Sequence, residues 1–203
     1  MPKLLHAADL QAHCAHILIA CGSSPAEADQ VAANLVLANL SGHDSHGVGM
    51  LPRYVDAIAE GGLLPNTAVK VSADIGTLMA LDGQHGFGQV VGVQAMELGI
   101  TRAKTHGSCI FTLAHAHHLG RIGHFAEMAV AQGLVSLHSS MCCRGPWWRP
   151  LGEGTGASAP TPAVLVCRWR ARSPSCWISP PAEWPKEKCA SHTTRASGCH
   201  QAT

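Results

Sequence analysis

The chain changes character near residue 143, and this change limits how much of it can build a hydrophobic core. All five tryptophans and eight of the twelve prolines lie beyond that point. Residues 144–203 contain no Asp, Asn, Phe, Tyr or Met, and only five of these sixty residues are Leu, Ile or Val. That number is too small for an ordinary core, and no helical or alternating period runs through the region. We therefore expect a folded part over about the first 140 residues and an irregular or disordered region over 141–203.

The start of the chain carries signals for helices. Residues 7–22 have apolar residues at helical spacing and end at Gly22, which is typical of a helix C-terminus. Residues 24–40 open with Ser24, Pro25 and Glu27, a capping box with proline at the first helical position. A third helix is predicted over 51–60, before two glycines. We assign residues 1–66 to a helical N-terminal part.

The following residues alternate between strand and helix patterns. The predicted strands cover 69–74, 77–83, 108–115 and 134–138, and the predicted helices between them cover 88–107 and 122–133. This alternation indicates an α/β class of fold. Residues 67–140 are accordingly predicted to form an α/β domain, and the family resemblance described below implies that this domain binds cofactor and substrate and is incomplete.

Charge and cysteine spacing exclude several classes of protein. The formal net charge of +1 gives no reason to expect binding to nucleic acid or to an anionic membrane. The start of the chain does not resemble a signal peptide, and no stretch reaches the roughly 20 apolar residues of a membrane span. None of the nine cysteines forms a C-x-x-C pair, so zinc knuckles and dithiol redox motifs are not supported. We expect a cytoplasmic protein.

The stretch SGHDSHGVGMLPRYV, residues 41–55, is the first candidate site. A histidine such as His46 exchanges protons near neutral pH, and an arginine such as Arg53 binds a carboxylate through two hydrogen bonds. The alternative is that Asp44 and Ser45 only cap the next helix, which would make His46 a bystander.

The segment HAHHLGRIGH, residues 115–124, is the second candidate. Its first three histidines resemble a metal-binding cluster. On a strand, however, His115 and His117 would share one face while His118 points away. Neither a carboxylate nor a cysteine nearby completes a ligand set, so we predict no metal site. The alternative is a strand end that faces a ligand cleft.

The glycines of LDGQHGFGQVVG, residues 81–92, lie between a predicted strand and a predicted helix. Their spacing is G-x-G-x-x-x-G, which differs from the dinucleotide-binding pattern G-x-G-x-x-G. The other interpretation is a tight turn with close packing of helix on strand.

Together, the segments SGHDSHGVGMLPRYV, LDGQHGFGQVVGVQAMELGI and HHLGRIGHFAE resemble the malate/L-lactate dehydrogenase family, in the family's order and over about the first 140 residues. The resemblance implies hydride exchange between NAD or NADP and a small 2-hydroxy or 2-oxo acid. It also implies a fold unlike the Rossmann fold, with the cofactor in a cleft between domains. Family members are usually homodimers. We do not expect this assembly from a chain that lacks a segment of the family's fold.

The resemblance also implies roles for particular residues. His118 matches the proton acceptor of related enzymes, and His46 is either its competitor or a partner that orients the substrate. Ser45, Arg53 and Tyr54 are expected to bind substrate. Many members carry an arginine where Met50 stands here, so Arg53 is the nearest substitute.

Cofactor binding is expected to involve three further residues. These are His117, Gly120 and Ser140.

The region after residue 140 lacks two segments that the family should carry, Arg-Phe-Gly-Thr-Asn-Pro and Leu-Asp-Phe-Ala-Thr-Ser. Permitted codons for 156–162 and for 176–188, read in one and the same offset frame, give these two segments in the right order. We therefore hypothesise a single frameshift between about residues 139 and 155. The chain would then lack a wall of its cofactor cleft, and we expect poor solubility and no turnover. The alternative is a non-catalytic remnant or a metal-binding module rich in His and Cys.

Overall fold

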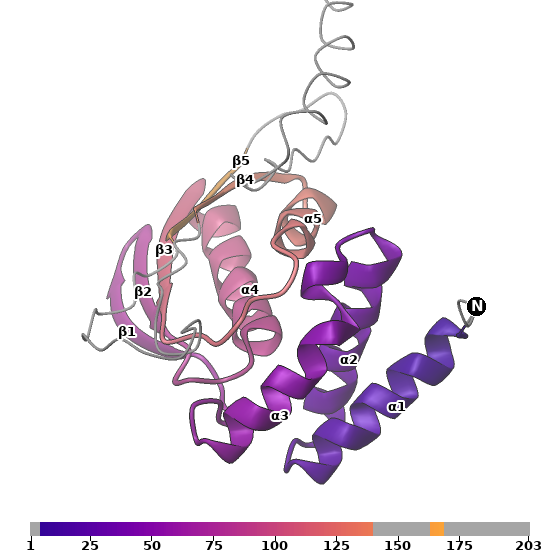
Figure 1. The fold of residues 1–203 in the computed structure, drawn as a ribbon. Helices are drawn as coiled ribbons and strands as arrows, with labels where there is room; N and C mark the ends of the chain where they lie inside the picture. The colour runs from indigo at the N-terminus through magenta and orange to yellow at the C-terminus, as the bar shows by residue number, and fades with distance from the viewer. Residues whose placement is uncertain (1–4, 140–162, 169–203) are drawn as a thin grey trace, which may run out of the picture.

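The computed structural model describes residues 5–139 and the backbone of 163–168, and it begins with a helical part (Figure 1). The three predicted helices of this part are confirmed. The helical elements are α1 (Ala7–Ala20), α2 (Pro25–Leu40), the 3-10 turns η1 (Asp44–His46) and η2 (Val48–Met50), and α3 (Leu51–Ala59).

The capping box at the start of α2 forms only in part. Ser24 Oγ accepts a hydrogen bond from the Glu27 backbone N–H at 3.3 Å, as predicted. The Glu27 carboxylate does not return to Ser24, because both of its oxygens accept the backbone N–H of Asn66, at 2.9 and 2.8 Å. The Asn66 side-chain oxygen accepts the Ser24 N–H instead, at 2.7 Å. A residue 42 positions away thus completes the cap and ties the loop after α3 to α2.

A mixed five-stranded sheet forms the second part, in the order β1-β2-β3-β5-β4. Strands β2 and β3 are parallel, and the other neighbouring pairs are antiparallel. The predicted α/β class is confirmed. The elements are β1 (Lys70–Ile75), β2 (Leu78–Asp82), α4 (Gly88–His106), β3 (Ser108–Ala114), α5 (Gly123–Ala131), β4 (Leu134–Ser139) and β5 (Ala163–Arg168).

Strand β5 corrects the expectation of an irregular region after residue 140. Its residues, AVLVCR, include three of the five Leu, Ile or Val residues of 144–203. β5 pairs with β3 on one side and with β4 on the other. A short apolar run suits such an inner strand, because its backbone groups are paired on both edges. The rest of 141–203 lies outside the described residues.

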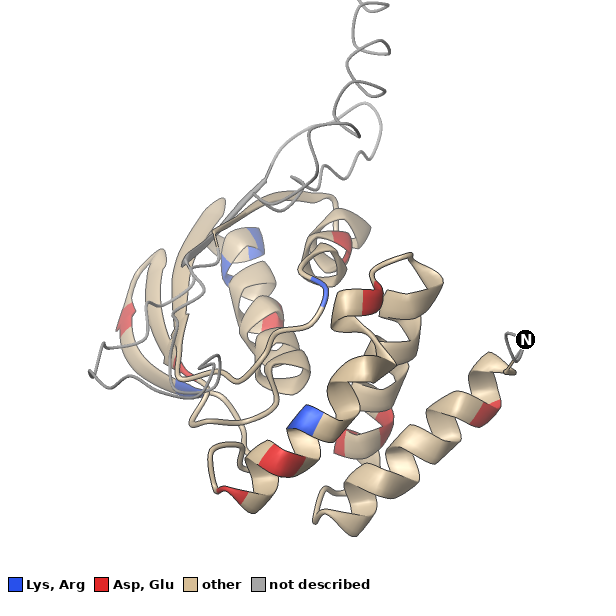
Figure 2. Ribbon diagram, viewed as in Figure 1, with Lys and Arg blue, Asp and Glu red and all other residues tan. Residues whose placement is uncertain are grey.

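Two hydrophobic clusters hold the described residues together. One joins α1, α2 and α3 to the start of α4, and the other joins α4 and α5 to the sheet. Helices α4 and α5 lie on the side of the sheet that faces the helical part (Figure 1). Charged residues are scattered over the described elements without a large patch of one sign (Figure 2). Among these residues no helix combines the length and apolarity that crossing a bilayer requires.

Candidate functional site

The site lies where the helical part meets the loop that follows β3. Tyr54 of α3 and His118 of this loop form a hydrogen bond, with Tyr54 Oη 2.7 Å from His118 Nδ1. The ring of His46, from η1, stacks on His118 with centroids 5.2 Å apart. His117 meets the Tyr54 ring edge-on at 5.7 Å. Two segments 60 or more residues apart in the sequence thus bring three histidines and a tyrosine together.

The loop that carries His46 is held by Asn39 near the end of α2. The Asn39 side-chain oxygen accepts the Val48 backbone N–H at 2.8 Å, and its amide nitrogen donates to Asp44 Oδ1 at 2.6 Å. Gly47 allows this close approach, since a side-chain carbon there would lie 2.2 Å from the Asn39 oxygen. The loop is therefore fixed from both sides, and His46 with it.

The histidines after β3 do not lie on a strand. β3 ends at Ala114, and His115 has a φ of +49°, so the chain turns there. His115 is exposed and contacts Asp82 Oδ1 at 3.1 Å, whereas His117 and His118 both face Tyr54. The expectation that His115 and His117 share a face was wrong, because the turn at His115 removes the alternation of a strand. Among the described residues no group of three or more His, Cys, Asp or Glu is placed to hold a metal ion.

Burial keeps the histidines of the site neutral. Desolvation, with the nearby charges of His46, His117 and Arg53, lowers the pKa of His118 to about 4. Desolvation, with Arg53 and His85, lowers the pKa of His117 to about 4 as well. Desolvation and His43 lower the pKa of His46. At neutral pH these rings are therefore unprotonated at one nitrogen and able to accept a proton.

The predicted substrate residues lie around this cluster. Ser45 is exposed, and its Oγ lies 2.8 Å from His46 Nδ1. Arg53 is exposed on α3, and its positive charge is close enough to lower the pKa of both His117 and His118. Tyr54 is fully buried, which raises the pKa of its hydroxyl.

The capping alternative for this segment is not supported. Within the described residues neither η1, η2 nor α3 has a side-chain cap, because the N-cap positions are His43, Gly47 and Met50.

The three predicted cofactor residues have different surroundings. His117 belongs to the cluster, and Ser140 lies outside the described residues. Gly120 is buried with a φ of +72°, and a side-chain carbon there would lie 2.7 Å from Asn34 Oδ1. The structure gives Gly120 a packing role between α2 and α4.

The glycines of 81–92 are explained by close packing. Gly86 N–H closes a tight turn onto the Gly83 carbonyl at 2.8 Å. A side-chain carbon at Gly88 would lie 2.4 Å from the His118 carbonyl oxygen, and one at Gly92 would lie 2.7 Å from the Phe125 ring. This packing presses the start of α4 against the loop that carries His118.

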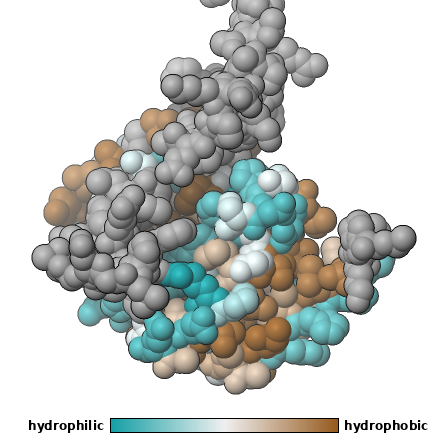
Figure 3. All heavy atoms as spheres, in the orientation of Figure 1, coloured by the Kyte–Doolittle hydropathy of each residue, from teal (hydrophilic) through white to brown (hydrophobic). Residues whose placement is uncertain are grey.

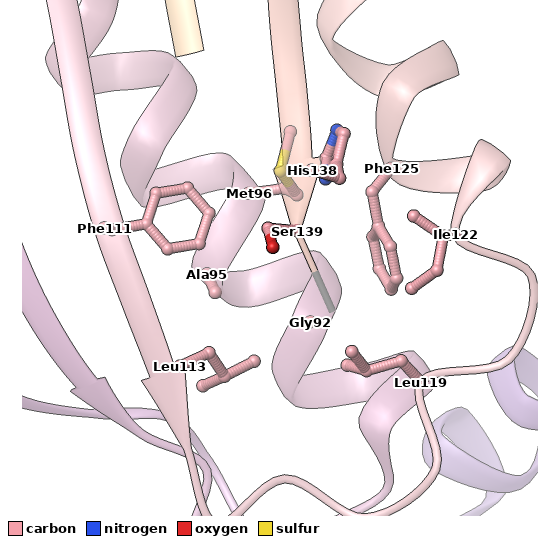
Figure 4. Close-up of a pocket in the computed structure, with 10 residues that line it drawn as sticks. All are labelled: Gly92, Ala95, Met96, Phe111, Leu113, Leu119, Ile122, Phe125, His138 and Ser139. Carbon is pink, nitrogen blue, oxygen red and sulfur yellow. The ribbon is translucent and has the colours of Figure 1, made fainter. Parts of the chain in front are cut away.

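A cavity between α4, α5 and the sheet is separate from the site (Figure 4). Phe111, Leu113 and Phe125 are among its mostly apolar lining, and His138 and Ser139 lie at its β4 side. Its volume of about 30 Å³ has room for one or two water molecules, which is too small for a cofactor or an organic acid.

Two residues of the site were not identified from the sequence. Asn39 holds the His46 loop, and Gln89 donates its amide Nε2–H to Tyr54 Oη at 2.6 Å while being 1 % exposed. For Gln89, the sequence offered one signal: it is a polar residue within an apolar run, directly after the second glycine of G-x-G. That pattern alone does not name a partner 35 residues away.

Comparison with known proteins gives one family. Residues 5–159 match the profile of the family described as malate/L-lactate dehydrogenase. Hydroxycarboxylate dehydrogenase B of Escherichia coli K12 is 47 % identical over 117 residues, which cover 58 % of this chain and 32 % of that protein. L-lactate dehydrogenase of Cupriavidus necator is 43 % identical over 137 residues, 66 % of this chain and 39 % of that protein. The chain thus spans about a third to two fifths of the length of these curated relatives.

Solved structures agree with these relatives. A structure described as a putative malate/lactate dehydrogenase from E. coli matches with a TM-score of 0.66 at 42 % identity, over 68 % of this chain and 38 % of that one. Sulfolactate dehydrogenase from Methanocaldococcus jannaschii matches with a TM-score of 0.65 at 27 % identity, over 80 % and 47 % of the two chains.

Proposed function

This chain belongs to the malate/L-lactate dehydrogenase family, and from that premise we propose that it derives from an oxidoreductase that exchanges hydride between NAD or NADP and a small 2-hydroxy or 2-oxo acid. One observation carries the proposal: the hydrogen-bonded pair of the buried Tyr54 and the half-buried His118 lies beside His46 and close to the positive charge of Arg53.

His118 is the acid/base in this proposal. Its Nδ1 is engaged by Tyr54 at 2.7 Å, which leaves Nε2 for the oxygen of a substrate. Its lowered pKa keeps the ring neutral at pH 7. A neutral ring with its proton on Nε2 hydrogen-bonds the carbonyl oxygen of a 2-oxo acid, and one with Nε2 unprotonated accepts a hydroxyl proton when a hydroxy acid is oxidised. His46 stacks on the same ring, so it competes for this role or orients the substrate.

Arg53 is the proposed carboxylate-binding group. It is exposed on α3, one residue before Tyr54, and its charge acts on both His117 and His118. A guanidinium in this position suits a 2-oxo or 2-hydroxy acid, whose carboxylate is adjacent to the reacting carbon. Ser45, whose Oγ lies 2.8 Å from His46 Nδ1, supplies a further hydroxyl.

The described residues do not by themselves fit a dinucleotide. Of the predicted cofactor residues only His117 faces the site, since Gly120 is packed against Asn34 and Gln89, and Ser140 lies outside the described residues. We therefore propose that most of the cofactor site belongs to chain beyond residue 139. The same proposal divides the chain into three regions. These are a helical N-terminal region (residues 1–66), an incomplete domain (residues 67–140) and an out-of-frame region (residues 141–203). A cytoplasmic location and the homodimer of a complete chain also belong to this proposal.

The proposal is tested with two chains, the 203-residue protein and one whose reading frame is restored after about codon 139. Each is assayed for NADH and NADPH oxidation with a panel of 2-oxo acids. We expect no turnover from the 203-residue chain and turnover from the restored one. His118→Gln in the restored chain should lower kcat by about 10²–10⁴-fold, the usual contribution of a general acid or base.

Three results would count against the proposal. Turnover by the 203-residue chain would refute its inactivity, and a frame that is closed beyond codon 139 would refute the frameshift. A restored chain without turnover on any 2-oxo acid would contradict the proposed reaction.

A further inference from the structure

Gln89 lies behind the Tyr54–His118 pair, at the other end of a chain of hydrogen bonds that leads through Tyr54 to His118. It occupies the first turn of α4 and is 1 % exposed. Its Nε2–H donates to Tyr54 Oη at 2.6 Å, and Tyr54 Oη lies 2.7 Å from His118 Nδ1. The three side chains form a line that runs from the interior of the protein to the proposed acid/base.

The direction of these hydrogen bonds fixes a proton on His118. A tyrosine hydroxyl has one proton, and here its oxygen already accepts from the Gln89 amide. The hydroxyl proton is therefore donated to His118 Nδ1, which must be unprotonated to accept it. A neutral imidazole carries its one proton on the other nitrogen, Nε2.

We infer that Gln89 is a positioning residue that selects the tautomer of His118 through Tyr54. The inference rests on the proposed function for its meaning in catalysis, but the tautomer itself is a property of this chain. With the amide as observed, His118 presents an Nε2–H to the substrate side, the form that hydrogen-bonds a carbonyl oxygen of a 2-oxo acid. A carboxylate at position 89 would accept a hydrogen bond from the Tyr54 hydroxyl. The Tyr54 oxygen would then accept a hydrogen bond from His118 Nδ1–H, which leaves His118 Nε2 free as an acceptor.

The packing around Gln89 supports a fixed orientation. The Gln89 backbone carbonyl accepts the Gln30 side-chain amide at 3.0 Å, which ties the start of α4 to α2. A side-chain carbon at Gly120 would lie 3.4 Å from Gln89 Cγ and 3.5 Å from its Nε2, so the amide is closely confined. Gln89 Oε1 is buried and has no hydrogen-bond partner among the described residues. A buried acceptor without a donor lowers the stability of the folded state. Gln89 nevertheless keeps the orientation in which its N–H is directed at Tyr54.

The test reads the tautomer directly and needs no turnover. The full 203-residue chain, labelled with ¹⁵N-histidine and sedimented, is examined by solid-state ¹⁵N NMR between pH 6 and pH 9, and His118→Gln identifies the His118 signals. We expect the unprotonated-nitrogen shift at Nδ1 and the N–H shift at Nε2 throughout this range. In Gln89→Glu we expect the two assignments to exchange as the pH rises and the new carboxyl ionises.

Two variants serve as controls. Gln132→Glu makes the same chemical change at an exposed position, the C-cap of α5, and it should leave the His118 signals unchanged. In a Tyr54→Phe background, Gln89→Glu should no longer move them, because the hydroxyl that connects the two residues is gone. This loss of coupling separates a role in positioning from a general effect on folding.

An Nδ1–H tautomer of His118 in the unmodified chain would overturn the inference, and this measurement needs only one variant, His118→Gln, to assign the signals. So would a Gln89→Glu spectrum that stays unchanged up to pH 9 while Tyr54 is present. Neither result bears on whether the restored chain reduces 2-oxo acids, so the inference and the proposed function fail separately.

Discussion

The helical part and the sheet part of this molecule differ in how completely they bury their apolar side chains. Helices α1 to α3 meet around a shared cluster in which Leu18, Leu35 and Tyr54 are fully buried. The most exposed apolar residues of that part, Leu5 and Leu40, lie at helix ends. Scattered residues of this kind are ordinary on a protein surface.

The sheet, in contrast, has apolar residues on both faces. Leu81 and Phe111 are buried under α4, while Ile75, Leu78 and Ile110 are exposed at directly paired positions of three neighbouring strands. Hydrophobic surface is visible on the sheet side in Figure 3. Strands that are apolar on both faces are typical of sheets covered on both sides. The described residues supply one covering layer, which agrees with a chain that spans only some of its relatives' length.

Phe111→Ala should have the largest effect on stability. The ring fills the space left by Gly99, whose missing side-chain carbon would lie 2.5 Å from it, so truncation leaves a cavity in the covered face of the sheet. We expect the free energy of unfolding to fall by about 3–5 kcal/mol, measured by urea unfolding.

Leu35→Ala, in the helical cluster, is the matched variant, with an expected loss of about 2–5 kcal/mol. If Phe111→Ala costs less than about 1 kcal/mol while Leu35→Ala costs its full amount, then the sheet is not packed under α4 as described.

Acid should loosen the junction between the two parts. His117 and His118 lie at this junction, and each has a pKa of about 4 when folded, below the ordinary value of 6.5. The unfolded chain therefore binds more protons between pH 6.5 and pH 4, and stability falls as the pH falls through that window. For His118 the loss reaches up to about 3 kcal/mol at pH 4, at 1.36 kcal/mol per pKa unit.

Urea unfolding at several pH values measures this slope. His118→Gln should flatten it, because one of the two responsible groups is removed. Stability that stays constant from pH 7 to pH 4 would show that these histidines are not buried at the junction.

Glu27→Gln tests the tie between α2 and the loop after α3, within the helical part. The carboxylate is 6 % exposed and accepts the Asn66 N–H with both oxygens, and an amide offers only one acceptor. We expect a loss of about 1.5–3 kcal/mol, the range for hydrogen bonds to charged groups. Asp29→Asn, at an exposed position of the same helix, is the control, and an equal loss in both variants would contradict the assigned role.

The smallest effect on stability is expected on the open face of the sheet. Ile75→Lys and Leu137→Lys replace residues that are 69 % and 64 % exposed, so unfolding free energies should change by no more than about 0.5 kcal/mol. Solubility should rise, as measured by the protein remaining in the supernatant after centrifugation. Leu40→Lys, at an isolated exposed position, should raise the solubility less. An equal rise would mean that the exposed apolar residues of the sheet do not lower solubility more than other exposed apolar residues do.

Much of the fold could be predicted locally. The period of the apolar residues and the glycines at helix ends gave the helices and strands of residues 7–139 to within two residues. Strand β5 was missed, because six residues without a period show their strand character only when partners lie on both sides. Glu27 was taken for a local cap, but a backbone N–H 39 residues away is its partner.

The candidate site divides in the same way. His46, Tyr54, His117 and His118 were identified from motifs, and the structure brings all four together. Asn39 and Gln89 were not, because their roles depend on which side chains lie opposite them after folding.

By itself, the sequence determined the α/β class, the order of the elements and the chemical groups of the site, since periodicity and residue type act over a few neighbouring positions. Only the tertiary structure decided that His115 turns away while His117 and His118 face Tyr54, and that Gln89 donates to the Tyr54 hydroxyl. Hydrogen-bond direction and burial depend on contacts between residues far apart in the chain, and folding alone creates those contacts.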